Sequence, residues 1–149
     1  MATIQLPTDF REFLKLFNDH QVEYLLIGGY AVGHYGYPRA TADLDIWVAI
    51  HPDNARNIVQ ALKGFGFNSA DLSESLFLKP DQIVRMGLPP LRIEIWMSVS
   101  GVQFDECYAS RTVAVWDKLR VNLIDLRHLK LNKKAAGRHK DLDDLENLP

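Results

Sequence analysis

The sequence predicts a single domain of the α/β or α+β class, because helical and strand-like segments alternate along a chain of ordinary globular length. The chain has 149 residues, of which 47% are hydrophobic, so it can bury a core and is not disordered. No internal repeat, low-complexity segment or linker interrupts the alternation. We therefore expect residues 1–149 to form one domain.

The N-terminal segments indicate a helix, a strand and a second, shorter helix. The first helix is expected over residues 8–20, with Thr8 or Asp9 as its cap. Its apolar residues recur at helical spacing: Phe10, Phe13, Leu14 and Phe17. A buried strand is expected over 22–29, where "VEYLLIGG" ends in two glycines, and one or two helical turns are expected over 29–36.

The middle of the chain favours strands on either side of one helix. A second apolar strand, "DLDIWVAI", is expected over residues 43–50. The helix after it has Pro52 suited to its first position and Gly64 suited to its end. Two further strands are expected over 82–87 and 91–99, and the intervening "LPP" indicates a hairpin connection.

The last third of the chain predicts a short helix, a strand pair and two closing helices. The short helix is expected over residues 104–110, and the strands over 112–116 and 119–124. The closing helices are expected over 125–137 and 139–148, parted by the glycine that ends the first of them. The chain is therefore expected to end in a helical pair.

Composition and charge exclude several classes of function. The formal net charge is −2, so the domain as a whole does not bind polyanions through bulk charge. No apolar run reaches the roughly 20 residues of a membrane span, and the N-terminal residues lack the pattern of a signal peptide. Cys107 is the single cysteine, which excludes an internal disulfide and fits a reducing cytoplasm.

Charges gather near the C-terminus. A run of cations without an intervening acid comprises Arg127, Lys130, Lys133, Lys134, Arg138 and Lys140. Acids follow at once: Asp141, Asp143, Asp144 and Glu146. This pattern fits either a solvated helix face with neighbours of opposite sign or a local phosphate-binding patch.

Two carboxylates occupy one face of the strand that begins at residue 43. Residues i and i+2 of a strand point to the same side, so Asp43 and Asp45 project together. At about 4 Å, two such charges repel by about 1 kcal/mol in water and about 4 kcal/mol at an effective dielectric constant of 20. Hard oxygen ligands on one rigid face suit Mg²⁺, whereas a solvated edge strand is the alternative interpretation.

A third acid, Glu94, lies between two isoleucines in a later strand, "LRIEIWMSV". It points away from the core side of that strand and is the best candidate for a third ligand. Two alternatives stay open, an exposed strand residue without a role and an ion pair with Arg92, which shares its face.

Two glycines, Gly28 and Gly29, follow the first expected strand and lead into a short helix. Glycines at such a turn let the backbone approach a ligand closely, and the free amides of a helix start attract phosphate. The G-x-G-x-x-G and Walker patterns are absent. A tight strand-to-helix turn without a ligand is the alternative.

Taken together, these features resemble the nucleotidyltransferase superfamily, whose fold is that of the polymerase-beta catalytic domain. The segment "GGYAVGHYGYPRATADLDI" is especially similar to a small prokaryotic branch that contains AbiEii-type and MenA-type toxins and minimal nucleotidyltransferases. That branch carries G-G-x-A…G…R-x-T-x-D-[LI]-D, which matches Gly28, Gly29, Ala31, Gly36, Arg39, Thr41, Asp43 and Asp45. The C-terminal "KKAAGRHKDLDDLENL" resembles the lysine-rich closing helices of the branch.

The resemblance implies a mixed β-sheet flanked by helices, with a C-terminal helical pair. It also implies transfer of a nucleoside monophosphate from a nucleoside triphosphate, such as ATP, to a hydroxyl group. Asp43, Asp45 and Glu94 would bind two Mg²⁺ ions, or Mn²⁺, and Glu94 would act as general base. Many members have Asp where this chain has Glu94, so its geometry as a ligand differs.

The resemblance also assigns residues to the nucleotide. Gly28 and Gly29 would cradle the triphosphate, and Arg39 would pair with phosphate or brace its loop. Thr41 fits a hydrogen-bonding role in that loop better than a ligand role. Lys133 matches a lysine that the branch places ahead of an A-A-G-R turn, from which it would reach the phosphates.

Two further functions compete with catalysis. One is a toxin–antitoxin component that mainly binds a partner protein, and the other is a nucleotide-binding regulator that never turns over. The acceptor can be tRNA, a protein or a small molecule, and the preferred base is open. A chain of 149 residues leaves little room for an acceptor domain, which favours a partner, an oligomer or a large substrate as the missing wall.

Overall fold

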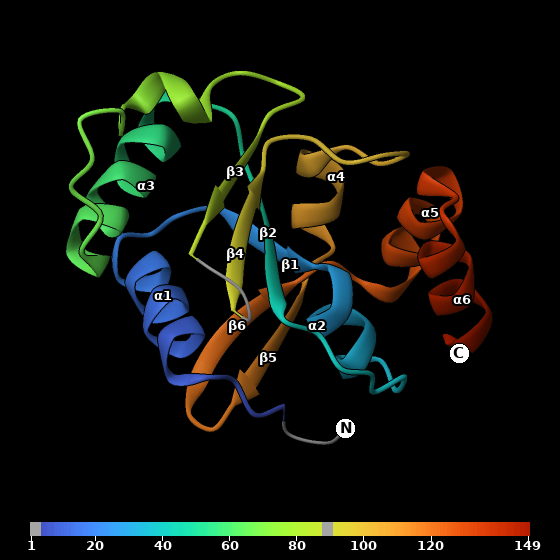
Figure 1. The fold of residues 1–149 in the computed structure, drawn as a ribbon. Coiled ribbons are helices and arrows are strands. Elements are labelled where there is room, and N and C mark those ends of the chain that lie inside the picture. Colours follow the sequence, from blue (N-terminus) through green and yellow to red (C-terminus); the bar gives the residue numbers. More distant parts are fainter. Residues whose placement is uncertain (1–3, 88–90) are drawn as a thin grey trace.

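The computed structural model describes residues 4–87 and 91–149, which build one six-stranded mixed sheet (Figure 1). In the order in which they lie side by side, its strands are β3 (Ile83–Met86), β4 (Arg92–Trp96), β2 (Asp43–Val48), β1 (Tyr24–Ile27), β6 (Leu119–Leu123) and β5 (Thr112–Trp116). The pairs β2–β4 and β1–β6 are parallel, and the other neighbours are antiparallel. The predicted α+β class with a mixed sheet is therefore confirmed.

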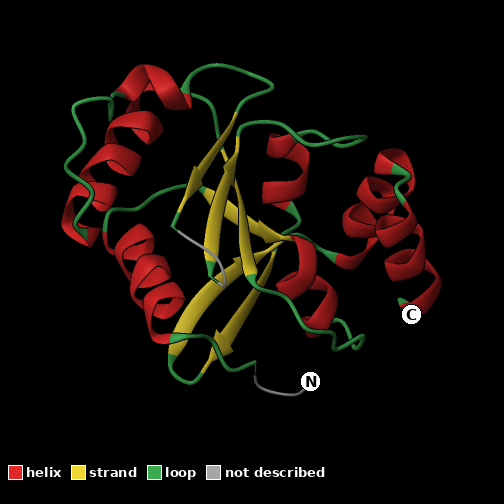
Figure 2. Ribbon diagram, in the orientation of Figure 1, coloured by secondary structure: helices red, strands yellow, loops and turns green. Residues whose placement is uncertain are grey.

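Helices cover both faces of this sheet (Figure 2). They are α1 (Thr8–Asp19), α2 (Gly28–His34), α3 (Pro52–Phe65), α4 (Phe104–Ala109), α5 (Leu126–Ala136) and α6 (His139–Asn147), together with a 3₁₀ turn, η1 (Glu74–Phe77). Helices α1 and α3 lie together on one side of the sheet, and α2 and α4 lie on the other (Figure 1). The predicted C-terminal pair, α5 and α6, packs as a hairpin beyond α2 and α4.

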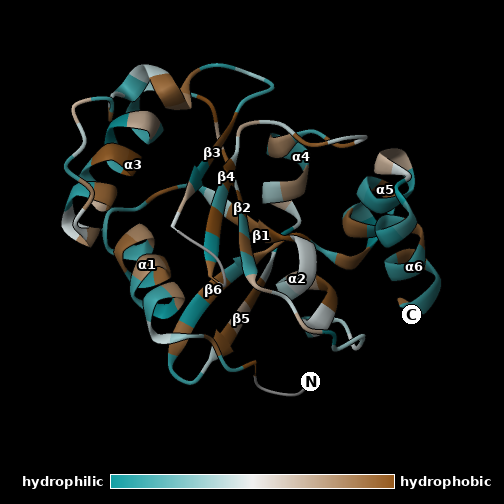
Figure 3. Ribbon diagram, viewed as in Figure 1, coloured by the Kyte–Doolittle hydropathy of each residue, from teal (hydrophilic) through white to brown (hydrophobic). Residues whose placement is uncertain are grey.

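The core forms where apolar residues meet between the sheet and these helices. All four residues of β1 are buried, as expected for a central strand with helices on both faces. On α1, the residues at helical spacing are buried, and Phe13 packs edge-on against Phe65 of α3 at 5.4 Å. Figure 3 shows the apolar sides of α1 and α3 turned toward the strands.

Two predicted helix ends differ from the structure. Helix α1 begins at Thr8 after Pro7, and neither Thr8 nor Asp9 caps it through its side chain. Helix α3 continues past Gly64 and ends at Phe65, where Gly66 has a φ of 107°. Only the second glycine has the left-handed backbone that closes a helix, whereas Gly64 continues the helix beside Leu16.

The other predicted elements are present with shifts of a few residues at their ends. Gly137, with a φ of 68°, parts α5 from α6 as expected. Strands β3 and β4 form an antiparallel pair, but the predicted "LPP" connection at 88–90 lies outside the described residues. No helix in the described part of the chain is both long and apolar enough to cross a membrane.

Candidate functional site

The register of two parallel strands places the predicted acids at one place on the sheet. Asp45 of β2 lies beside Glu94 of β4, and Asp43 lies beside Arg92. On its other side, Asp45 lies opposite Ile27, the last residue of β1 before the glycine turn. The fold therefore brings Asp43, Asp45, Glu94 and Gly28 to neighbouring positions, although they are far apart in the sequence.

Two arginines pair with two of the acids. The Arg92 guanidinium donates to both carboxylate oxygens of Asp43, at 3.3 and 3.4 Å. Arg85 of β3 donates through Nε to Glu94, at 2.9 Å. The ion pair considered between Arg92 and Glu94 is thus replaced, because antiparallel pairing of β3 with β4 puts Arg85 opposite Glu94. Glu94 is 7% exposed, so this pairing offsets the cost of burying its charge.

Within the described part of the chain, no cation pairs with Asp45. Its carboxylate accepts a hydrogen bond from the indole N–H of Trp96, at 3.3 Å. Burial, followed by the charge of nearby Glu94, raises the pKa of Asp45 to about 6. The hydrogen bond from Trp96 opposes this rise, and Asp43 adds a smaller increase. This carboxylate therefore lies in a negative field that a bound cation would relieve.

The glycine turn between β1 and α2 is shaped around the acids. Gly28 has a φ of +68°, and a Cβ atom there would overlap the carboxylate of Asp45. A Cβ atom on Gly29 would come within 2.8 Å of Cβ of Thr41. Thr41 in turn accepts a hydrogen bond from the backbone N–H of Asp43, at 3.3 Å, as expected for a residue that shapes the loop. Both glycines thus allow backbone to lie against the strand that carries the acids.

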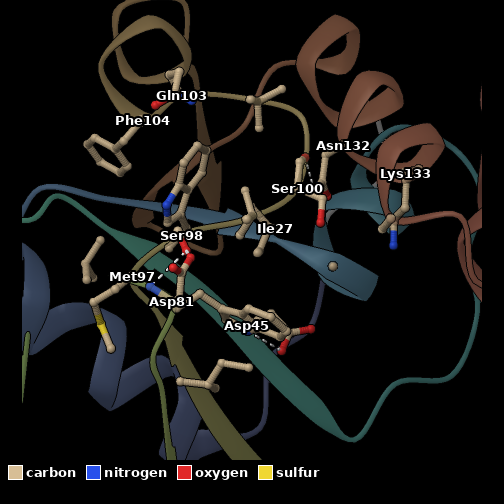
Figure 4. A pocket seen from close by; sticks show the side chains of 18 of the residues that line it. Ile27, Asp45, Asp81, Met97, Ser98, Ser100, Gln103, Phe104, Asn132 and Lys133 are labelled. Carbon is tan, nitrogen blue, oxygen red and sulfur yellow. Dashed lines mark hydrogen bonds between the residues drawn. The ribbon is translucent and has the colours of Figure 1, made fainter. Parts of the chain in front are cut away.

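A cavity of about 900 Å³ opens beside this turn. Gly28 and Asp45 line one part of it, and Lys133, Arg138 and Lys140 line it from α5, α6 and the segment between them. Figure 4 shows Asp45 and Lys133 reaching the same cavity from β2 and α5. A more apolar part is lined by residues that include Trp47, Met97 and Phe104. The cavity thus joins a carboxylate, cations and an aromatic wall.

The predicted metal site fits a divalent cation in its donor chemistry. Carboxylate oxygens are the ligands that Mg²⁺ prefers, and Asp45 lies in the field of two other acids. The side chains do not converge as they stand, since within residues 4–87 and 91–149 no group of three His, Cys, Asp or Glu residues is placed to hold a metal ion. Arg85 and Arg92 supply the positive charge to Glu94 and Asp43 instead.

The predicted phosphate-binding residues Arg39 and Lys133 belong to a buried ion network. Arg39 donates to both oxygens of Asp144, at 2.7 and 2.9 Å. Lys133, 4% exposed, lies 2.9 Å from Asp144 and 3.4 Å from Asp141, which also accepts from Arg138. Asp141 and Asp144 are thus ion-pair partners, and Arg39 ties the loop before β2 to α6.

In this network, the nearby cations lower the pKa values of the acids by more than burial raises them. Burial by itself would raise the pKa of Asp144, but hydrogen bonds from Arg39 and Lys133 bring it below its ordinary value. The same balance holds for Asp141, where Arg138 and Lys133 oppose burial. Both acids are therefore charged in the folded chain at neutral pH, and they hold Lys133 at the wall of the cavity.

Sequence reasoning missed two contacts of the acids. Trp96 lies two residues after Glu94 and so shares its face, but its bond to Asp45 depends on which strand lies alongside. No sequence pattern indicated the contact of Arg85 with Glu94, because that contact arises from the pairing of β3 with β4. The cavity wall contributed by α4 was likewise not readable from local pattern.

The solved structures that this chain resembles in fold are described as nucleotidyltransferases or nucleotidyltransferase-like proteins. The chain is similar in structure to a Thermotoga maritima protein whose description as a nucleotidyltransferase is provisional, with a TM-score of 0.61 and 14% identity over 92% of this chain and 88% of that one. It is also similar to an antigenic nucleotidyltransferase-like protein of Paracoccidioides brasiliensis, with a TM-score of 0.52 and 18% identity over 95% and 76%.

These likenesses confirm the fold that the resemblance implied. No protein-family model matches the sequence, and no curated protein matches it either. The assignment to the small prokaryotic branch with AbiEii-type and MenA-type toxins therefore stays a prediction, as do the roles of the individual residues.

Replacing Asp45 by Asn should stabilise the fold. Asp45 binds its proton more tightly in the folded than in the unfolded chain, so the free energy of unfolding falls as the pH rises from about 4 through about 6. Asn cannot ionise, and Asp45→Asn is expected to add on the order of 2 kcal/mol near neutral pH and little near pH 4. Urea unfolding at several pH values measures this, with exposed Glu12→Gln as control. An equal effect at all pH values would contradict the prediction.

A matched pair of glycine substitutions tests the close approach of Gly28 to Asp45. Gly28→Ala and Gly137→Ala meet the same backbone strain, since both glycines have a φ of 68°. An added methyl group meets only ordinary contacts at Gly137 but overlaps the Asp45 carboxylate at Gly28. Thermal unfolding should show a loss of about 1–2 kcal/mol for Gly137→Ala and a clearly larger loss for Gly28→Ala. Equal losses would mean that the carboxylate moves aside freely.

Removing Arg39 should destabilise the protein far more than removing a surface cation. Arg39→Ala leaves Asp144, which is fully buried, with Lys133 as its only remaining cation among the described residues. The expected loss is about 3 kcal/mol by denaturant unfolding, as for other broken buried ion pairs. The control is Lys15→Ala, which removes an exposed partner of Asp19 and should cost less than about 1 kcal/mol. A small effect of Arg39→Ala would show that water reaches Asp144.

Proposed function

We propose that this chain is a metal-dependent nucleotidyltransferase, which transfers a nucleoside monophosphate from a nucleoside triphosphate to a hydroxyl group and releases pyrophosphate. The observation that carries the proposal is the register of β2 and β4, which sets Asp45 beside Glu94 at the edge of a cavity lined by both cations and acids. A parallel pair held by hydrogen bonds is a rigid support for such acids. The fold of the chain is also that of the two solved structures described above, which are described as nucleotidyltransferases or nucleotidyltransferase-like proteins.

The residues divide into those facing the reacting phosphate and those facing the rest of the triphosphate. Gly28 lies against the Asp45 carboxylate at the start of α2, where backbone amides without helical partners would attract phosphate. Arg138 and Lys140 line the cavity and, with Lys133, supply the charge that a polyphosphate needs. The more apolar part, with Trp47 and Phe104, suits a base or another flat group.

Asp43, Asp45 and Glu94 are the residues that would hold Mg²⁺ or Mn²⁺. When bound, such ions neutralise charge on the phosphates and orient the attacking and leaving oxygens in line. For this chain, binding requires Glu94 and Asp43 to exchange Arg85 and Arg92 for a cation. The side chains of Arg85 and Arg92 are 58% and 40% exposed, so water can solvate both guanidiniums once they leave the carboxylates. Once released from Arg85, Glu94 would be the group that accepts the proton of the hydroxyl.

The proposal predicts that Asp43→Asn abolishes transfer while the fold stays intact. Asp43 lies at the surface of β2 and keeps its shape as Asn, whereas the lost charge weakens cation binding. The expected result is a fall of at least about 100-fold in Mg²⁺-dependent pyrophosphate release and in labelling of acceptors from radioactive nucleoside triphosphates. Cell extract supplies the unknown acceptor, and the labelled product shows whether it is RNA, protein or a small molecule.

Glu12→Gln is the control for this experiment, since it removes an exposed acid of α1 far from the cavity. Full metal-dependent turnover by folded Asp43→Asn protein would contradict the proposal. So would an original chain that releases no pyrophosphate with any nucleoside triphosphate, metal ion or extract tested.

A nucleotide-binding regulator without turnover is the second candidate. The observation that favours it is the pairing of Glu94 with Arg85, which holds the proposed general base in an ion pair. Calorimetry separates the two functions. Tight binding of a nucleoside triphosphate without pyrophosphate release, both in the original chain and in Arg85→Ala, would favour the regulator.

A further inference from the structure

The outer edge of strand β5 is a part of the surface that the proposed function leaves unexplained. Strand β5 is terminal in the sheet, and among the described strands it pairs with β6 alone (Figure 1). It reads Thr-Val-Ala-Val-Trp, without proline or a charged residue (Figure 3). Edge strands usually carry such residues because unpaired edges recruit other strands. At the opposite edge of the sheet, β3 carries a charged residue, Arg85.

Pairing with β6 decides which backbone groups of β5 are free. The hairpin turns over Asp117 and Lys118, both with positive φ, so Trp116 and Leu119 form the hydrogen-bonded pair next to the turn. Bonded and non-bonded pairs then alternate, and Ala114 is bonded to Val121. The N–H and C=O groups of Val113 and Val115 point away from β6. Among the described residues, neither valine has another backbone partner.

The side chains of the same two valines are the exposed ones. Val113 is 45% exposed and Val115 is 62% exposed, whereas Ala114 between them is 9% exposed. Isolated apolar residues on a surface are ordinary, but these two lie on one face of one strand, beside free backbone groups. Apolar surface and unpaired hydrogen-bonding groups therefore coincide at this edge.

We propose that β5 pairs antiparallel with β5 of a second copy of this chain, so that two sheets join about an axis at Ala114. In this register Val113 of each copy exchanges both backbone hydrogen bonds with Val115 of the other, and the valine side chains contact across the strands. The sequence Val113–Ala114–Val115 reads the same in both directions, which makes the edge self-complementary.

Charge favours the same register. Counting outward from Ala114, Arg111 of one copy falls opposite Asp117 of the other, at both ends of the pairing. The Arg111 guanidinium donates through Nη1 to the carbonyl of Tyr108 and lies over its ring, while its buried Nε has no hydrogen-bond partner among the described residues. Asp117 is exposed and has no cation partner among the described residues. An acidic or basic partner of another kind would match only one end of the strand.

The dimer should be weak. Two five-residue strands bury less than the roughly 1,200 Å² of an ordinary stable interface, so association is expected at a concentration of about 100 µM. Sedimentation velocity on the whole chain from about 5 to about 500 µM should show a monomer passing into a dimer by mass action. Over that range, hydrogen exchange at the amides of Val113 and Val115 should slow, while the amide of Ala114 stays protected throughout.

Three substitutions of Val115 test the strand pairing. Val115→Lys puts a charge on the exposed face, and Val115→Pro removes an outward N–H that the fold itself does not use. Each should raise the dissociation constant more than about tenfold, whereas the control Val115→Thr should change it less than about threefold. If Val115→Pro lowers the melting temperature, Val115→Lys carries the test, because residue 115 is exposed.

Asp117→Asn tests the register, since Asn tolerates the positive φ of the turn but lacks the charge for Arg111. It should weaken the dimer and make association less sensitive to salt. A chain that stays monomeric at all these concentrations would overturn the proposal. So would a dimer that Val115→Lys leaves unchanged, because the copies would then meet at another surface.

Discussion

The parallel pairing of β2 with β4 is the constraint on which the candidate site depends. It sets Asp45 beside Glu94 and Asp43 beside Arg92 without any contribution from loops. The cost is that Asp45 is held in a half-buried place beside other negative charge, and burial first and the Glu94 charge second raise its pKa. Arg85, Arg92 and the Trp96 indole divide this charge among them, so the sheet accommodates an arrangement that would otherwise repel itself.

The cavity depends on a second electrostatic arrangement behind the first. Arg39, Lys133 and Arg138 pair with Asp141 and Asp144, which are buried between the loop and α6. Lys133 and Arg138 also line the cavity, so the same cations brace the wall and border the space in which a ligand would bind. Bracing and phosphate binding are compatible roles, because a cation held by buried carboxylates is already positioned when an anion arrives.

Local pattern was sufficient for most of the fold. The phenylalanines of α1 at helical spacing, the alternation around Asp43 and Asp45, and Gly137 between the last helices each determine structure through neighbours in the sequence. The two wrong helix ends arose where two signals compete over a few residues, as with Gly64 and Gly66. The mixed sheet itself came from the family resemblance, since its strand order depends on pairings between distant segments.

The candidate site was less readable, for the same reason. Sequence spacing could gather Asp43 with Asp45, but only the pairing of β4 with β2 and with β3 shows that Glu94 lies beside Asp45 and faces Arg85. Likewise, a run of cations near the C-terminus looked like either a solvated face or a phosphate patch. The structure shows that Lys133 is buried and paired with Asp144. Arg39 also pairs with Asp144, at a separation of 105 residues in the sequence, and local pattern does not reveal such a contact.

That separation has a consequence for how the molecule is made. A ribosome releases Arg39 long before Asp144 is synthesised, so the loop ahead of β2 has no anchor while most of the sheet is already available. The cavity wall is consequently among the last parts to assemble. A nascent chain that stops short of α6 carries the acids of the site on a sheet that is still open on that side.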